Sequence, residues 1–326
     1  MLSTIEKTTS PPLIRFPNGN TAAAPTSLEA QVGNTPLIQL KHIAADAGLP
    51  EQVQLFAKAE WFNPSGSVKD RPALNIIRTA EQQGRLKPGM TLMDSTSGNM
   101  GIAYAMLGAG RGYHVKITLP QNASPERIAV LRSLGAELIF TDPLEGSDGA
   151  IREVRRLAVE APADVYYANQ YNNPANWQAH YYTTANEIWA QTGGQVTHFV
   201  AGLGTSGTFV GTTRRLKELN PYIRCISFQP DSPFNGLEGL KHMATAIQPG
   251  IYDPFSADAD MGVRTEDAYD MARQLARKEG LFVGISSAAA VTAAVEAAQT
   301  VDKGIVVTIL PDSGLKYLSE RFWNEH

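Results

Sequence analysis

Short apolar runs and helix-like segments alternate along most of this chain. Apolar runs suited to buried strands occur at residues 53–57, 91–93, 114–119, 137–140, 198–201, 225–228 and 305–310. Helix-like segments lie between them, at residues 70–83, 101–108, 125–133, 147–159, 177–191, 207–219, 265–279 and 288–300. Strands that alternate with helices in this way are typical of parallel sheets covered on both faces. The pattern therefore predicts an α/β protein with doubly wound, mostly parallel open sheets.

The alternation is interrupted at two places, and these predict the domain organisation. Residues 1–28 are rich in Thr, Pro, Ser, Asn and Ala and predict a flexible N-terminal arm, or alternatively an arm that wraps a partner subunit. The polar stretch 169–176 indicates a division between two domains, which a chain of 326 residues is long enough to form. We expect a smaller α/β domain at 53–165 and a larger one formed by 29–52 plus 166–326.

Composition narrows the classes of function. The formal net charge of −4 provides no basic patch for nucleic acid or a membrane surface, and no apolar run reaches the roughly 18 residues of a membrane span. The N-terminus lacks the apolar core of a signal peptide. The single cysteine, Cys225, excludes an internal disulfide and a multi-thiolate metal site. The six histidines show no metal-ligand spacing. We therefore expect a cytoplasmic protein without a metal.

A lysine stands at the predicted start of a helix, in the segment NPSGSVKDRP. Lys69 follows Ser67 and precedes Asp70, either of which is a candidate helix cap, and Pro72 suits the first turn. The positive end of the helix dipole disfavours a cation there, so the lysine pKa is expected to be lowered. An amine of lowered pKa suits a nucleophile and base near neutral pH. The alternative is an ordinary solvated lysine.

Three further polar loops lie where a strand ends and a helix begins, which is where open α/β sheets bind ligands. Residues 94–101 (DSTSGNMG) combine hydroxyl groups, an amide and helix N–H groups, and they predict a carboxylate or phosphate site. Residues 201–208 (AGLGTSGT) lack the Gly-Lys-Ser/Thr ending of a nucleotide P-loop, and no acidic residue lies suitably downstream to bind a ribose. The loop therefore suits a phosphate monoester better than a dinucleotide. Two further features are weaker signals. Residues 284–288 (GISSA), taken alone, are better explained as a helix cap. The pair Lys241–His242 could meet an anionic substrate, but such a pair alone is more often a solvated face.

Taken in order, these motifs resemble the cysteine synthase family, which comprises pyridoxal-phosphate enzymes of fold type II. The similarity runs from Gly33 onward through GNTPLIQL, NPSGSVKDRP, TSGNMGIA, GTSGTFVGT, GLFVGISSAA and ILPDSGLKYLS. The segments HYYTTANEI and THFV and the loop that ends in GLKHM look like the B-type branch of the family. The resemblance implies two α/β domains with the cofactor in the cleft between them, and a homodimer. Some family members also bind a partner's C-terminal peptide in the active site.

The resemblance also implies roles for individual residues. Lys69 would form the Schiff base with pyridoxal 5′-phosphate, Asn99 would hydrogen-bond the ring oxygen, and Ser286 would face the pyridine nitrogen. The cofactor phosphate would be held by Gly204, Thr205, Ser206, Gly207 and Thr208. The substrate carboxylate would be bound by Thr96, Ser97, Gln170 and the backbone N–H of Met100. Lys241 stands where some B-type members carry an arginine that meets a substrate phosphate.

The implied reaction is a β-replacement that makes L-cysteine from an O-activated L-serine and a sulfur donor, through an aminoacrylate. A neutral Ser286 opposite the pyridine nitrogen favours elimination over racemisation or transamination. O-acetylserine and O-phosphoserine both remain open as donors, and sulfide and thiosulfate both remain open as sulfur sources. The alternatives are a synthase with another nucleophile, such as a cystathionine β-synthase-like or diaminopropionate-forming enzyme, and a non-catalytic binding or regulatory protein of the same fold.

Three positions depart from the usual family pattern. Met100 replaces the Thr of TSGNT, Ala288 replaces the Gly of GISSG, and Ala185-Asn186 replace a Gly-Pro pair. Met100 is the departure that bears on function, since it lies where the substrate carboxylate or the incoming nucleophile is received.

Overall fold

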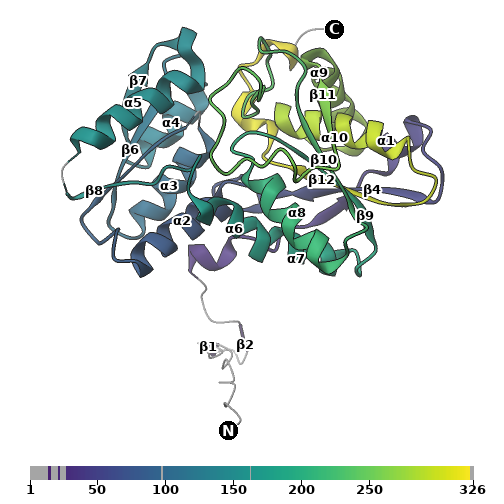
Figure 1. The fold of residues 1–326 in the computed structure, drawn as a ribbon, viewed down its shortest axis with the longest axis horizontal. Coiled ribbons are helices and arrows are strands. Elements are labelled where there is room, and N and C mark those ends of the chain that lie inside the picture. The colour runs from purple at the N-terminus through teal and green to yellow at the C-terminus, as the bar shows by residue number, and fades with distance from the viewer. Residues whose placement is uncertain (1–13, 16–20, 23–26, 97, 162, 324–326) are drawn as a thin grey trace.

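The computed structural model describes residues 14–15, 21–22, 27–96, 98–161 and 163–323 of the chain. Two sheets with their helices lie side by side (Figure 1), and the helices α2 and α6 lie near the junction between them. The arm predicted at 1–28 falls for the most part outside the described residues. Within it, Ile14–Arg15 (β1) pairs antiparallel with Thr21–Ala22 (β2).

The smaller sheet has four parallel strands in the order β7-β6-β5-β8. These are β5 (Thr91–Ser95), β6 (His114–Pro120), β7 (Glu137–Thr141) and β8 (Val165–Tyr167). The connections between these strands are the helices α3 (Asn99–Ala109), α4 (Pro125–Ser133) and α5 (Gly146–Glu160). Helices α3 and α4 contact each other, and α5 packs on β5 and β6. Helix α2 (Asp70–Gln82) shares the apolar core of α3.

The larger sheet has six strands in the order β11-β10-β9-β12-β4-β3. The short β3 (Leu37–Gln39) pairs antiparallel with β4 (Val53–Ala59). The other strands are parallel: β9 (Val196–Gly202), β10 (Arg224–Pro230), β11 (Ala259–Val263) and β12 (Gly304–Leu310).

Two apolar cores cover this larger sheet. One contains α1 (Lys41–Asp46), α9 (Thr265–Gln274) and α10 (Ile285–Ala298), and the other contains α7 (Thr184–Gln191) and α8 (Gly207–Leu219). Helix α6 (Pro174–Tyr182) packs on α8 and α2. The predicted fold class, doubly wound and mostly parallel α/β sheets, is confirmed.

The predicted start of the smaller domain at residue 53 is wrong. Strand β4 belongs to the six-stranded sheet, where it pairs with β12 in parallel from Val53 opposite Gly304 to Ala59 opposite Leu310. The apolar pattern of a strand indicates that the strand is buried, but it does not indicate which strand it pairs with. The pairing of β4 with β12, about 250 residues later, therefore could not be predicted from the local pattern. The expected end of the smaller domain, residue 165, falls on the first residue of β8 (Val165–Tyr167), which is the last strand of the four-stranded sheet along the chain.

Several elements differ from the prediction in extent. The helix expected at 177–191 is two helices, α6 and α7, which are separated at Thr183, where φ is −118° and ψ is −74°. Helix α9 ends in a π-helical turn at Leu275–Glu279, and α10 begins at Ile285 instead of residue 288. In the part of the chain that the structure describes, no helix is long and apolar enough to cross a membrane.

Candidate active site

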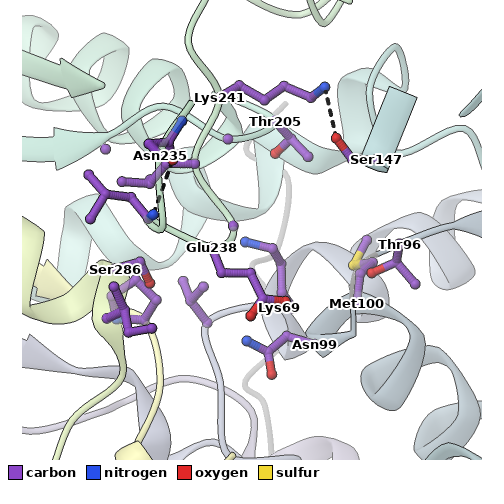
Figure 2. A pocket seen from close by; sticks show the side chains of 18 of the residues that line it. Lys69, Thr96, Asn99, Met100, Ser147, Thr205, Asn235, Glu238, Lys241 and Ser286 are labelled. Carbon is purple, nitrogen blue, oxygen red and sulfur yellow. Dashed lines mark hydrogen bonds between the residues drawn. The ribbon is translucent and has the colours of Figure 1, made fainter. Parts of the chain in front are cut away.

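A cavity of ≈ 560 Å³ is lined by residues of both sheets and by the segment 233–241 that follows β10 (Figure 2). Several of the lining loops lie at the carboxyl ends of parallel strands, where helix N-termini converge. The cavity brings together most of the predicted site residues: Lys69, Thr96, Asn99, Met100, Gln170, Gly204, Thr205, Ser206, Thr208, Lys241 and Ser286. Gly207 is outside the lining set, and Ser97 lies outside the described residues.

Lys69 occupies the N-cap position of α2, and its side chain lines the cavity. Neither candidate cap fills that position: Ser67 Oγ accepts from the Lys69 N–H at 3.3 Å, and the Asp70 carboxylate turns back to the Ser65 N–H at 2.7 Å. Burial lowers the pKa of Lys69, Asp312 opposes that shift and Lys316 adds to it. The direction agrees with the sequence prediction, but burial is the leading cause instead of the helix dipole.

The loop between β9 and α8 is a tight turn that lines the cavity with Gly204, Thr205 and Ser206. Ser206 is the N-cap of α8 in a left-handed conformation, with φ +67°, and its buried Oγ has no hydrogen-bond partner among the described residues. Thr205 Oγ1 accepts from Asn176 Nδ2 at 3.1 Å. A Cβ on Gly204 would lie 2.3 Å from the Gly239 carbonyl oxygen, so only glycine fits there.

The loop between β5 and α3 is held by side chains from elsewhere in the chain. Asn99 donates through Nδ2 to Asp312 Oδ2 at 2.7 Å and accepts at Oδ1 from Lys316 Nζ at 2.8 Å. Gly98 is the N-cap of α3 with φ +153°, and a Cβ there would lie 2.2 Å from Arg127 Cδ. Met100 is buried in the first turn of α3, whose N–H groups point out of the helix end.

The buried carboxyl group of Asp94 lies at the end of β5, where the β5–α3 loop begins, and hydrogen-bonds the residues around it. Asp94 accepts from the N–H groups of Ser95 at 2.9 Å and Gln170 at 3.2 Å, and from the Tyr104 hydroxyl at 3.1 Å. Burial raises the pKa of Asp94 to about 7. Gln170 itself donates through Nε2 to the Ser95 carbonyl oxygen at 2.6 Å, which leaves the second Nε2 hydrogen for another acceptor.

Ser286 and Lys241 complete the set of predicted residues. Ser286 lies in the first turn of α10, at the opposite side of the cavity from Thr96 and Met100 (Figure 2). Lys241 is 6% exposed and donates to Asp148 Oδ1 at 2.6 Å, across the cleft on α5. Its ammonium group is therefore paired, so the solvated-face alternative for Lys241 is wrong.

Comparison with known proteins agrees with this geometry. The family described as "Pyridoxal-phosphate dependent enzyme" matches residues 28–312. The chain is 50% identical over 298 residues to a cysteine synthase of Aquifex aeolicus, covering 90% of this chain and 91% of that protein. The corresponding figures for cysteine synthase B of Escherichia coli K12 are 40% over 302 residues, with 92% and 97% covered. The crystal structure of cysteine synthase from Entamoeba histolytica superposes with a TM-score of 0.87 at 36% identity, covering 96% of this chain and 94% of that one.

The chain belongs to the cysteine synthase family of pyridoxal-phosphate-dependent enzymes. The resemblance found in the sequence motifs is confirmed, and so are the enzyme class and the dependence on pyridoxal phosphate. The alternative of a non-catalytic protein is set aside, because the family and these relatives are enzymes.

The residues present fit the cofactor of this family. The unpartnered Ser206 hydroxyl and the N-terminus of α8 provide donors for a phosphate group. Gly207 leaves no room for a side chain, since a Cβ there would lie 2.0 Å from Asn176 Oδ1. Lys69 supplies an amine whose Nζ has no hydrogen bond or ion pair among the residues that the structure describes. The cavity volume is that of an ordinary small-molecule site.

Sequence reasoning missed five residues that shape this site. Arg127 and Glu238 line the cavity and form an ion pair with each other. Asp312 and Lys316 hydrogen-bond Asn99. The Tyr317 ring lies against the Arg127 guanidinium. Asp312, Lys316 and Tyr317 belong to the segment ILPDSGLKYLS, which contributes to the sequence analysis only as a family motif. Side chains of these types often form hydrogen-bond networks, and this is the signal that could have found them. Arg127 is on α4 and Glu238 follows β10, and no pattern in the neighbouring residues of either one predicts that the two are in contact.

Proposed function

We propose that this enzyme makes L-cysteine by β-replacement, with O-acetyl-L-serine as the donor and an inorganic sulfur nucleophile as the acceptor. The observation that carries the proposal is the meeting of three features in one cavity. Lys69 supplies an amine of lowered pKa, and the β9–α8 and β5–α3 loops each present a helix N-terminus to that cavity. One such end suits the cofactor phosphate and the other the substrate carboxylate.

The proposed roles of the cofactor-binding residues follow from their positions. Pyridoxal phosphate, when bound, withdraws electrons from the α-carbon of an amino acid joined to it. Lys69 would hold it covalently, and Gly204, Thr205, Ser206, Gly207 and Thr208 would surround its phosphate. Asn99 would donate to the ring oxygen. Ser286 would present a hydroxyl group to the ring nitrogen, and since a hydroxyl does not keep that nitrogen protonated, elimination is favoured over racemisation.

The same reasoning assigns the substrate residues. Thr96, Ser97, Gln170 and the Met100 N–H would orient the substrate carboxylate at the start of α3. The substrate amine would displace Lys69 from the cofactor, and the freed Lys69 amine would remove the α-proton while the acetate group leaves. After the sulfur nucleophile has added at the β-carbon, Lys69 would return a proton to the α-carbon and rejoin the cofactor, which releases L-cysteine. Lys241 would lie at the rim of this pocket with its charge balanced by Asp148.

Product analysis tests the proposal. Purified enzyme loaded with pyridoxal phosphate is given O-acetyl-L-serine with sulfide, thiosulfate, homocysteine or ammonia in separate reactions, and the amino-acid products are identified by mass spectrometry. We expect L-cysteine to be the main product, with sulfide the fastest nucleophile. Faster formation of cystathionine or diaminopropionate would replace the proposal with one of the two alternative synthases.

We further propose a cytoplasmic homodimer, on the strength of the family resemblance and the single buried Cys225. Light scattering after size exclusion measures the oligomeric state directly. Binding of a C-terminal peptide from a partner protein in the active site is a proposal of the same origin. Displacement of O-acetylserine by such a peptide tests it.

A further inference from the structure

Two of the three cations that line the cavity are paired with carboxylate groups. Among the described residues that line the cavity, the cations are Lys69, Arg127 and Lys241, and the acids are Glu238 and Glu320. Arg127 pairs with Glu238, and Lys241 pairs with Asp148 at 2.6 Å. Lys69 is therefore the one cation in this described set that forms no ion pair with a carboxylate, and the proposed chemistry uses its amine.

The Arg127–Glu238 pair is fixed from both sides. The Arg127 guanidinium lies over the Tyr317 ring at 4.6 Å from its centroid, and the side chain is 2% exposed. Gly98 packs directly against its methylene groups. Because this side chain is enclosed, Arg127 stays where it is, and it holds the Glu238 carboxylate at the cavity wall.

The segment that carries Glu238 is also ordered by hydrogen bonds. Leu237 N–H donates to Asn235 Oδ1 at 3.0 Å, a contact visible in Figure 2, and Gly236 N–H donates to Thr265 Oγ1 at 3.0 Å. Figure 2 shows the Glu238 side chain directed into the cavity, in the same region as Lys69 and Asn99. The Glu238 side chain is 31% exposed, so its carboxylate remains accessible from the cavity although Arg127 pairs with it on the buried side.

We propose that Glu238 is a specificity-determining residue that selects a donor with an uncharged leaving group. This inference rests on the proposed function and deepens it. A phosphate leaving group carries close to two negative charges at neutral pH and would approach Glu238 without an uncommitted cation to receive it. An acetyl ester carries no charge and meets no such repulsion. Discrimination then comes from a repulsive contact with the wrong donor.

Glu238→Gln tests the proposal, because it removes the charge and keeps the shape and an acceptor for Arg127. The quantity measured is kcat/KM for O-phospho-L-serine divided by kcat/KM for O-acetyl-L-serine, with sulfide as nucleophile. We expect this ratio to rise about tenfold or more in the variant. Glu266→Gln, which makes the same change of charge at an exposed position on α9, is the matched control and leaves the ratio unchanged.

The unaltered enzyme provides an independent measurement. Repulsion between charged groups weakens as salt screens it. Binding of O-phospho-L-serine, followed by calorimetry, is therefore expected to tighten between low and high ionic strength, while O-acetyl-L-serine binding stays nearly constant. This measurement holds even if the variant does not fold.

The outcomes separate the two proposals. An unchanged ratio in Glu238→Gln, or unaltered enzyme that uses O-phospho-L-serine as well as O-acetyl-L-serine, overturns the role of Glu238 and leaves the β-replacement standing. Phosphoserine binding that weakens with salt also overturns it. Failure to form cysteine from either donor overturns the proposed function itself.

Discussion

Two loops of this enzyme have the same local construction and are held in different ways. The β9–α8 loop of the larger sheet is tied to α6: Thr205 bonds Asn176, 29 residues away, and Thr208 contacts His180, 28 residues away. The β5–α3 loop of the smaller sheet is tied across the molecule. Asn99 bonds Asp312 and Lys316, which are 213 and 217 residues away.

The difference suits the roles proposed for the two loops, which line one cavity. The β9–α8 loop is built from neighbouring helices of one half of the protein, as suits a group that stays bound. The β5–α3 loop depends on Asp312 and Lys316, the residues whose charges also act on the pKa of Lys69. Asp312 and Lys316 therefore link the β5–α3 loop, the proposed substrate loop, to the Lys69 amine.

Removing the amine between the two loops has the largest expected effect. Lys69→Ala abolishes the visible absorption of bound cofactor that depends on a lysine bond, and it lowers turnover by about 10³-fold or more, since nucleophile and base are the same group. Absorption spectra and cysteine assays measure both. Turnover at the rate of the unaltered enzyme would show that Lys69 is not the reacting residue.

A methyl group in the β9–α8 loop tests whether that loop is rigid. In Gly207→Ala the new Cβ would collide with Asn176 Oδ1, and overpacking of this kind costs about 1–3 kcal/mol. We expect the Kd for pyridoxal phosphate to rise roughly ten- to a hundredfold, measured by fluorescence titration of the apoprotein. Gly110→Ala is the control, because Gly110 has a helical φ of −69° and its nearest neighbour to a Cβ is at 3.8 Å. Equal affinity for pyridoxal phosphate in both variants would show that the β9–α8 loop shifts to accommodate the new methyl group and is not rigid.

Charge changes behind the β5–α3 loop are expected to shift the Lys69 pKa in opposite directions. Lys316 lowers that pKa and Asp312 raises it, so Lys316→Met raises the pKa and Asp312→Asn lowers it further. Cofactor uptake by the apoprotein requires the neutral amine. Its pH profile should therefore move to higher pH in Lys316→Met and to lower pH in Asp312→Asn.

The exposed Lys303→Met is the control for this pair and leaves the profile in place. Shifts of the same sign in Lys316→Met and Asp312→Asn would contradict the electrostatic coupling, because a purely structural disturbance has no reason to follow the sign of the charge.

The carboxyl group beneath the β5–α3 loop has the smallest expected effect. The pKa of Asp94 rises from its ordinary 3.8 to about 7 in the folded protein. A carboxyl pKa that is raised on folding contributes stability below the unfolded value, and that stability is lost as the pH rises through the folded value. The difference in unfolding free energy between Asp94→Asn and the unaltered enzyme is therefore expected to favour the variant more at pH 8 than at pH 5, by about 2–3 kcal/mol.

Urea unfolding at the two pH values measures this difference. The exposed Asp267→Asn is the control and changes the free energy of unfolding by less than about 0.5 kcal/mol at either pH. A pH-independent effect of Asp94→Asn would show that the carboxyl group is ionised throughout.

The pattern of apolar and polar residues along the chain was sufficient to predict most of the helices and strands. It was also sufficient to locate the polar loops that line the cavity. Helices α4 and α8 have the predicted bounds, because Pro125 and Gly207 begin them and Gly135 and Asn220-Pro221 follow their ends. Lys69 and the two polar loops were found because each follows a strand and begins a helix. Short elements such as β3, β8 and α1 were missed, since three to six residues carry too little periodicity to detect.

The sequence by itself therefore determined the fold class, the family and the loops in which the chemistry lies, because strands, helix starts and glycine-dependent turns are written in neighbouring residues. Only the tertiary structure decided that β4 belongs to the larger sheet, that Asp312 and Lys316 hold Asn99, and that Glu238 pairs with Arg127 in the cavity. These contacts join residues a hundred or more positions apart. Their partners are chosen by packing and charge in three dimensions, which no local pattern in the chain records.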